Sequence, residues 1–124
     1  MRAITSTLVP ILSVAAAGVL AVACGETRDD GPMSEGRRLA LDSGCAACHG
    51  SNGEGGVGPT WVGLYGSTVT LEDGSTVTAD DAYLFEAIRD PSAKKVKGYS
   101  VMPPNSLSDA EVQAIVDYIK TLTK

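Results

Sequence analysis

The sequence predicts a small all-α domain of three to four helices with a short β-hairpin inserted between them. Apolar residues recur at helical spacing near the carboxyl end, and two earlier stretches begin with residues that cap helices. An Asp-Gly pair between two short alternating segments indicates the hairpin. With 124 residues the chain holds one domain at most, which we expect over residues 34–124.

The first 23 residues have the layout of a signal peptide. Arg2 gives a positive start, an apolar stretch follows, and Ala21-Val22-Ala23 fits a small-x-small cleavage site. Cys24 follows directly, which resembles a bacterial lipobox, where this cysteine is lipidated. We therefore predict a signal peptide over 1–23 and a lipidated tether over 24–33. Cleavage without lipidation and a retained membrane anchor are the alternatives, and all three export the domain.

Two helices are expected at the ends of the domain. Ser34 can cap a first helix over residues 35–43, whose inner face would hold Leu39, Ala40 and Ser43. The last helix begins with a capping box, Ser108-Asp109-Ala110-Glu111. Its apolar stripe consists of Val112, Ile115, Val116, Ile119 and Leu122.

The middle of the domain predicts a hairpin followed by a helix. Residues 69–77 alternate around Asp73-Gly74. Thr78 can cap a helix over 79–89 that has Asp81 at the reciprocal position, and Asp90-Pro91 ends it. The residues expected to face inward are Leu84, Ala87 and Ile88.

The stretch from Gly50 to Gly66 predicts a loop that wraps another group. It holds seven glycines and one proline, and such a composition sustains neither a helix nor a strand. Its second half also carries bulky apolar residues, namely Trp61, Leu64 and Tyr65. Bulky apolar side chains in an irregular loop need a surface to pack against.

The run Cys45-Ala46-Ala47-Cys48-His49 has the clearest chemistry. C-x-x-C-H is typical of c-type haem attachment, in which both thiols bond to the porphyrin and the imidazole binds the iron. His49 is the only histidine, which excludes a bis-histidine haem. Zinc would need a fourth protein ligand, and a redox C-x-x-C belongs beside a βαβ pattern, so we rank both below haem. We expect one covalent haem c, on which the bulky loop residues would pack.

Met102 is the candidate for the second iron ligand. Met33 lies in the tether, whereas Met102 follows a segment long enough to cross to the opposite haem face. Two prolines after it would stiffen the loop that presents its sulfur. A core methionine without a ligand role, a lysine ligand and an open sixth position are the alternatives.

Charge excludes one class of partner and leaves one cluster to explain. Fifteen acidic residues against ten basic ones give a net charge of -5, so nucleic acid is not an expected partner. Three lysines lie close together in this acidic chain, namely Lys94, Lys95 and Lys97. They form either a solvated loop or a docking patch near the haem edge, and one of them is the alternative iron ligand.

Taken together, these features resemble class I monohaem cytochromes c. The resemblance rests on Cys45–His49, Gly58-Pro59, Met102 before its prolines and the terminal helix ending Tyr118-Ile119-Lys120. It covers residues 34–124 and implies a small cytochrome c fold around one covalent haem. The segment between Gly58 and Met102 is most similar to the cytochrome c domain fused to subunit II of bacterial haem-copper oxidases. The copper-binding domain found there has no counterpart here, so we expect a free-standing relative.

The resemblance also implies roles for individual residues. Cys45 and Cys48 take the thioether positions, His49 is the proximal ligand and Met102 the distal one. The Pro59 carbonyl would accept a hydrogen bond from the proximal imidazole, which orients the ring. The further residues expected against the haem are Trp61, Leu64, Tyr65 and Tyr99, and Trp61 could instead bond a propionate.

One structural role follows from the same resemblance. Gly36 and Ile115 match the close crossing of the first and last helices, with Tyr118 beside it.

The function implied is a periplasmic monohaem electron carrier, tethered by lipid to the outer face of the membrane and monomeric when free. It would pass single electrons from a quinol-oxidising complex towards a terminal oxidase. With both axial positions filled the iron has no room for substrate, so no residue is expected to be catalytic. A cytochrome c subunit fixed in a larger oxidoreductase and a five-coordinate haem sensor or peroxidase are the alternatives.

Overall fold

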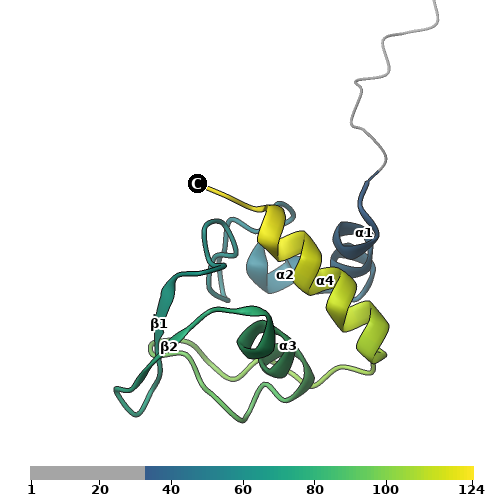
Figure 1. Cartoon of the computed structure of the whole chain (residues 1–124). Helices are drawn as coiled ribbons and strands as arrows, with labels where there is room; N and C mark the ends of the chain where they lie inside the picture. Colours follow the sequence, from purple (N-terminus) through teal and green to yellow (C-terminus); the bar gives the residue numbers. More distant parts are fainter. Residues whose placement is uncertain (1–32) are drawn as a thin grey trace, which may run out of the picture. The chain divides into compact units, whose positions relative to one another are not determined.

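The computed structural model describes residues 33–124 (Figure 1). The signal peptide predicted over 1–23, the predicted lipidation of Cys24 and nearly all of the tether lie outside the described residues. Within residues 33–124, none of the helices combines the length and apolar character that crossing a membrane requires.

The described domain is mainly helical with one short two-stranded sheet. The elements, in chain order, are α1 (Glu35–Asp42), α2 (Ala46–His49), β1 (Thr68–Thr70), β2 (Thr76–Thr78), α3 (Asp81–Arg89) and α4 (Asp109–Thr121). The predicted helices and hairpin are therefore present, although the strands mean that the fold is not purely α-helical.

Helix α4 is the centre of the core, and α1 and α3 both pack against it (Figure 1). The predicted capping box is present, since the Ser108 and Glu111 side chains each bond the other's backbone. Four residues of the predicted stripe are fully buried, namely Val112, Ile115, Val116 and Ile119. Leu122 follows as the half-buried C-cap. The stripe prediction is thus confirmed up to the end of the helix.

The crossing of α1 and α4 depends on a glycine. A Cβ atom placed on Gly36 would lie 1.9 Å from the Ala114 carbonyl oxygen and 2.7 Å from the Tyr118 Cβ. The close crossing beside Tyr118 was predicted, but the nearest backbone is that of Ala114, one residue before the expected Ile115. Ser43 was expected on the inner face of this helix. It is exposed, because α1 ends at Asp42 and Ser43 forms its C-cap.

The hairpin has the predicted position and a defined register. β1 and β2 are antiparallel, and Val69 pairs with Val77 across them. Leu71, just beyond β1, forms an isolated bridge with Val96. The chain that follows α3 therefore returns to the hairpin.

The predicted cap of α3 was wrong. Thr78 pairs with Thr68 at the end of the β-ladder, so its backbone is not available to begin a helix. Asp80 is the N-cap instead, and its carboxylate accepts a hydrogen bond from the Tyr83 N–H at 2.8 Å. The helix ends at Arg89, as predicted, and Asp90 is its C-cap.

Candidate haem site

The two cysteines of the motif lie on one helical turn. The His49 N–H donates to the Cys45 carbonyl at 3.0 Å, which closes α2 around Cys48. Residues three apart in a helix share a face, so both thiols can reach the same edge of a planar group. Both are free thiols that are half-buried, and burial raises the pKa of the Cys45 thiol. This arrangement suits two thioether bonds to one porphyrin.

His49 is buried and oriented by the backbone. Its Nδ1 lies 2.8 Å from the Pro59 carbonyl oxygen, which can only accept, so Nδ1 carries the proton. Burial lowers the pKa of His49, and the hydrogen bond to Pro59 partly opposes this shift. The imidazole is therefore neutral at pH 7, and its Nε2 keeps a lone pair for a metal.

Two residues of the glycine-rich loop bound the imidazole ring. Trp61 stacks on it with ring centroids 4.6 Å apart and an angle of 21° between the planes. A Cβ atom on Gly58 would lie only 2.8 Å from the His49 Cε1. The backbone N–H of Trp61 donates to the Gly53 carbonyl at 2.7 Å, which closes the loop behind the imidazole ring. The loop thus restricts the position of the imidazole as well as its protonation.

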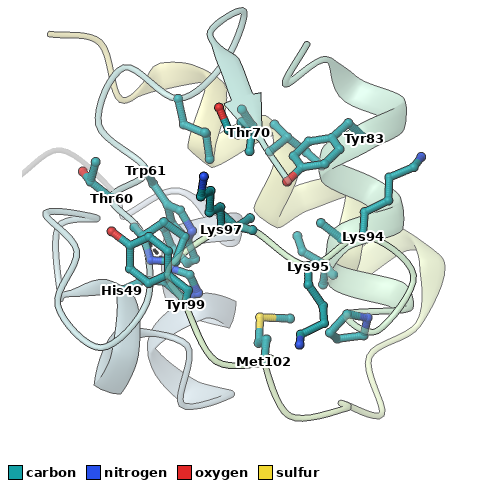
Figure 2. Close-up of a pocket in the computed structure, with 18 of the residues that line it drawn as sticks. His49, Thr60, Trp61, Thr70, Tyr83, Lys94, Lys95, Lys97, Tyr99 and Met102 are labelled. Atoms are coloured by element: carbon teal, nitrogen blue, oxygen red, sulfur yellow. Dashed lines mark hydrogen bonds between the residues drawn. The ribbon is translucent and has the colours of Figure 1, made fainter. Parts of the chain in front are cut away.

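A cavity of about 560 Å³ opens beside His49 (Figure 2). The predicted site residues that line it are His49, Pro59, Trp61, Leu64, Tyr99 and Met102. The remainder of the wall is largely apolar and includes Val69, Leu84, Ile88, Val96 and Ile119. Cofactor pockets typically have this size and this mixture of an apolar wall with a few polar groups.

Met102 reaches the cavity from the irregular segment 91–107, which connects α3 to α4. Asn105 and Arg89 link this segment to the end of α3. The Asn105 side chain donates to the Ile88 carbonyl at 2.7 Å, and Arg89 donates to the Leu107 carbonyl at 2.5 Å. Neither residue was singled out from the sequence, because nothing in the pattern shows which distant carbonyl a side chain will reach.

Of the residues predicted to bind the cofactor, Cys45 and Cys48 are not among those that line the cavity, and neither is Tyr65. The Tyr65 side chain is exposed, and its hydroxyl donates to Asp81 Oδ2 at 2.9 Å. Lys120 Nζ lies 2.6 Å from the other oxygen of Asp81 and 5.1 Å from the centroid of the Tyr65 ring. Hydrogen bonds from Lys120 and Tyr65 lower the pKa of Asp81. Tyr65 therefore links the glycine-rich loop to α3 and α4.

Some residues of the cavity were not assigned to it from the sequence. Tyr83 is buried on the inner face of α3, and Thr70 lies at the end of β1. The helical periodicity of α3 was the available signal for Tyr83, which lies one residue before the predicted inward Leu84. For Thr70 there was no signal, since the sequence does not show which hairpin residues face a ligand.

A C-x-x-C pair on one turn, a neutral buried imidazole and a facing cavity that also holds a methionine define a c-type haem protein. The chain matches the Cytochrome c family over residues 33–123, and it belongs to that family. Among solved structures it is similar to cytochrome cH from Methylobacterium extorquens. The identity is 30%, the match covers 73% of this chain and 99% of that one, and the TM-score is 0.55. None of the curated proteins matches it.

Family membership makes haem c the cofactor and electron transfer the role of this chain. The residues present fit that group, since the donor set is an imidazole nitrogen and a thioether sulfur beside an apolar cavity of suitable size. When bound, the haem supplies a one-electron Fe(II)/Fe(III) couple. Cys45 and Cys48 would hold the haem, and residues of the glycine-rich loop and of the segment 91–107 line the cavity beside it.

Proposed function

We propose that this cytochrome c is a high-potential electron carrier whose iron is bound by His49 and Met102. The observation that carries the proposal is the placement of both side chains around one cavity, with His49 Nδ1 already engaged by Pro59. Ligation by both residues would leave no coordination position for a substrate. A neutral thioether ligand favours the ferrous state, and burial of the ring adds to this effect. Single-electron exchange is then the chemistry left, and the protein is not an enzyme.

The pathway we propose runs from a quinol-oxidising complex through this cytochrome to a terminal oxidase. The support is the resemblance of the segment between Gly58 and Met102 to the cytochrome c domain of haem-copper oxidase subunit II. We place the protein in the periplasm, at the outer face of the cytoplasmic membrane, held by a lipid on Cys24. The support for this location and for the lipid anchor is the lipobox-like sequence after an apolar segment.

The test is quinol-dependent oxygen consumption by membrane vesicles that contain both complexes but lack their own cytochrome c. Added wild-type holoprotein should restore consumption. Met102→Ala should restore at least about tenfold less, because loss of the thioether lowers the potential and hinders reduction by the quinol complex. Met33→Ala is the matched control, since Met33 is exposed and outside the cavity. Equal rates with both variants, or no restoration by the wild type, would contradict the proposal.

The tether needs a separate experiment. Intact-mass analysis of membrane-extracted wild type should show a diacylglycerol adduct that Cys24→Ser lacks, and the variant should appear in the soluble periplasmic fraction. If the variant stays with an oxidase complex at moderate salt, the protein is a fixed subunit instead of a shuttle.

A further inference from the structure

The cavity has a charge opposite to that of the chain. The protein carries fifteen acidic and ten basic residues, with a net charge of -5. The charged residues that line the cavity are nevertheless all cationic, namely Lys94, Lys95 and Lys97. The lining includes no carboxylate. A lining of this kind suits a ligand with negative groups, and the propionate carboxylates of haem are such groups.

Two of these lysines are already paired within the protein. Lys94 forms an ion pair with Glu86, and this contact raises the pKa of Lys94. Lys95 Nζ lies 2.5 Å from Glu72 Oε2. In the part of the chain that the structure describes, Lys97 has no carboxylate within ion-pair distance. Lys97 is therefore the cation at the cavity whose charge the described protein leaves uncompensated.

The backbone holds Lys97 at this position. Its N–H donates to the Thr70 carbonyl at 3.0 Å, and the neighbouring Val96 pairs with Leu71 beyond the same strand. In the view of Figure 2 the Lys97 side chain lies near the middle of the cavity, whereas that of Lys94 runs outward at its edge. The position of Lys97 beside β1 is thus set by main-chain hydrogen bonds and not by an acidic partner.

We propose that Lys97 is the counter-ion of a haem propionate and that it raises the reduction potential of this cytochrome. A carboxylate without a partner near the iron favours the ferric state, because the negative charge stabilises the extra positive charge. An ammonium group on that carboxylate removes most of this effect. The inference depends on the haem, which family membership establishes, and not on the identity of the electron-transfer partners.

Redox titration of the holoprotein tests this role with four proteins: wild type, Lys97→Gln, Lys97→Arg and Lys95→Gln. At a fixed ambient potential, Lys97→Gln should lower the ferrous-to-ferric ratio about tenfold, which is about 59 mV for a one-electron couple. Lys97→Arg keeps the charge and should stay within about twofold of wild type. Lys95→Gln makes the same change in net charge and should shift the ratio less than about threefold, because Lys95 is already paired with Glu72 and is not available to a propionate. Lys97 is exposed, so neither substitution at this position removes a buried group.

Three results would overturn the proposal. Equal shifts for Lys97→Gln and Lys95→Gln would make Lys97 an ordinary surface charge. A shift in Lys97→Arg as large as in Lys97→Gln, with haem attachment verified by mass, would show that the charge is not responsible. Loss of the wild-type ferric spectrum in Lys97→Gln would identify Lys97 as an iron ligand instead.

Discussion

The two sides of the cavity are built differently. On the proximal side, the only histidine is 7% exposed, a carbonyl and an indole ring contact its ring, and a Cβ atom on Gly58 would have no room beside it. On the distal side, Met102 is half-buried in a segment without regular secondary structure. Side-chain hydrogen bonds link this segment to α3 after Met102, through Asn105 and Arg89.

This difference indicates how the two proposed iron ligands, His49 and Met102, would depend on the haem. The protein alone orients the imidazole, so the proximal side should be nearly the same before and after the cofactor is attached. Met102 is half-buried in an irregular segment, so bonding to the iron should supply much of what holds it in place. Substitutions on the proximal side should therefore change stability most, and those on the distal side should change access to the iron most.

The largest effect on stability is expected from Trp61→Ala. The substitution removes a buried ring from both the His49 imidazole and the edge of Tyr118, whose centroid lies 6.3 Å away. The free energy of unfolding, measured by guanidinium titration of the holoprotein, should fall by about 3–5 kcal/mol. Trp61→Phe keeps an aromatic ring on the imidazole and should cost clearly less. Equal losses in the two variants would mean that the stacked ring contributes little.

Gly58→Ala should cause the next largest loss of stability. It also tests whether the position of the His49 ring can be changed separately from the stability of the fold. The new methyl group would lie 2.8 Å from His49 Cε1, so the ring or the loop must move, at a cost of about 1–3 kcal/mol. Gly36→Ala is the matched control, since it crowds the α1–α4 crossing instead. Both variants should unfold more easily, but only Gly58→Ala should alter the ferric spectrum. A spectrum unchanged in Gly58→Ala would contradict the close contact.

Asn105→Ala should have a smaller effect on stability and a selective effect on the distal side. It removes the hydrogen bond between the Met102 segment and α3 and a local one from the Leu107 N–H to Asn105 Oδ1, together worth about 1–2 kcal/mol in unfolding. It should also speed the binding of imidazole to the ferric protein, because Met102 leaves the iron more readily. Ser92→Ala is the control, as it removes a hydrogen bond to Asp90 that is local to the same segment. Similar imidazole rates in both variants would show that the Asn105 link does not restrain Met102.

The smallest effect is expected from Asp81→Asn, which breaks the surface link between the proximal loop and α4. The pKa of Asp81 is lowered in the folded protein, so its charge stabilises the fold above the ordinary aspartate pKa of about 3.9. That contribution is lost as the pH falls through the lower, folded value. The melting temperature of the variant should thus be slightly below wild type at pH 7, and the difference should shrink as the pH falls through the folded pKa of Asp81. A difference that persists at low pH would mean that charge is not the source.

The sequence was a good guide where the signal was local. The Ser108–Glu111 box and the apolar stripe after it depend on spacing within one helix, and both are found as expected. Asp73-Gly74 likewise located the hairpin. The resemblance to a family, rather than any local pattern, led to the expected contact of His49 with the Pro59 carbonyl.

The sequence was a poor guide where contacts between distant segments determine which of several similar residues takes a role. Thr78 and Asp80 can both cap a helix, and pairing of Thr78 with β1 decided between them. Tyr65 and Trp61 are equally suitable for a haem pocket by residue type, but Tyr65 is exposed and bonds Asp81 of the Asp81–Lys120 pair. Nor can three neighbouring lysines be told apart until their acidic partners are known.

Carbon monoxide binding to the ferrous protein tests the central claim most directly, namely that Met102 fills the position opposite His49. The Soret band of wild type and of Met33→Ala should not change when the gas is added, whereas Met102→Ala should bind it. Rapid binding by the wild type would contradict the account, because it would mean that the iron has an open site. Failure of Met102→Ala to bind carbon monoxide would also contradict the account, since another residue would then be the ligand opposite His49.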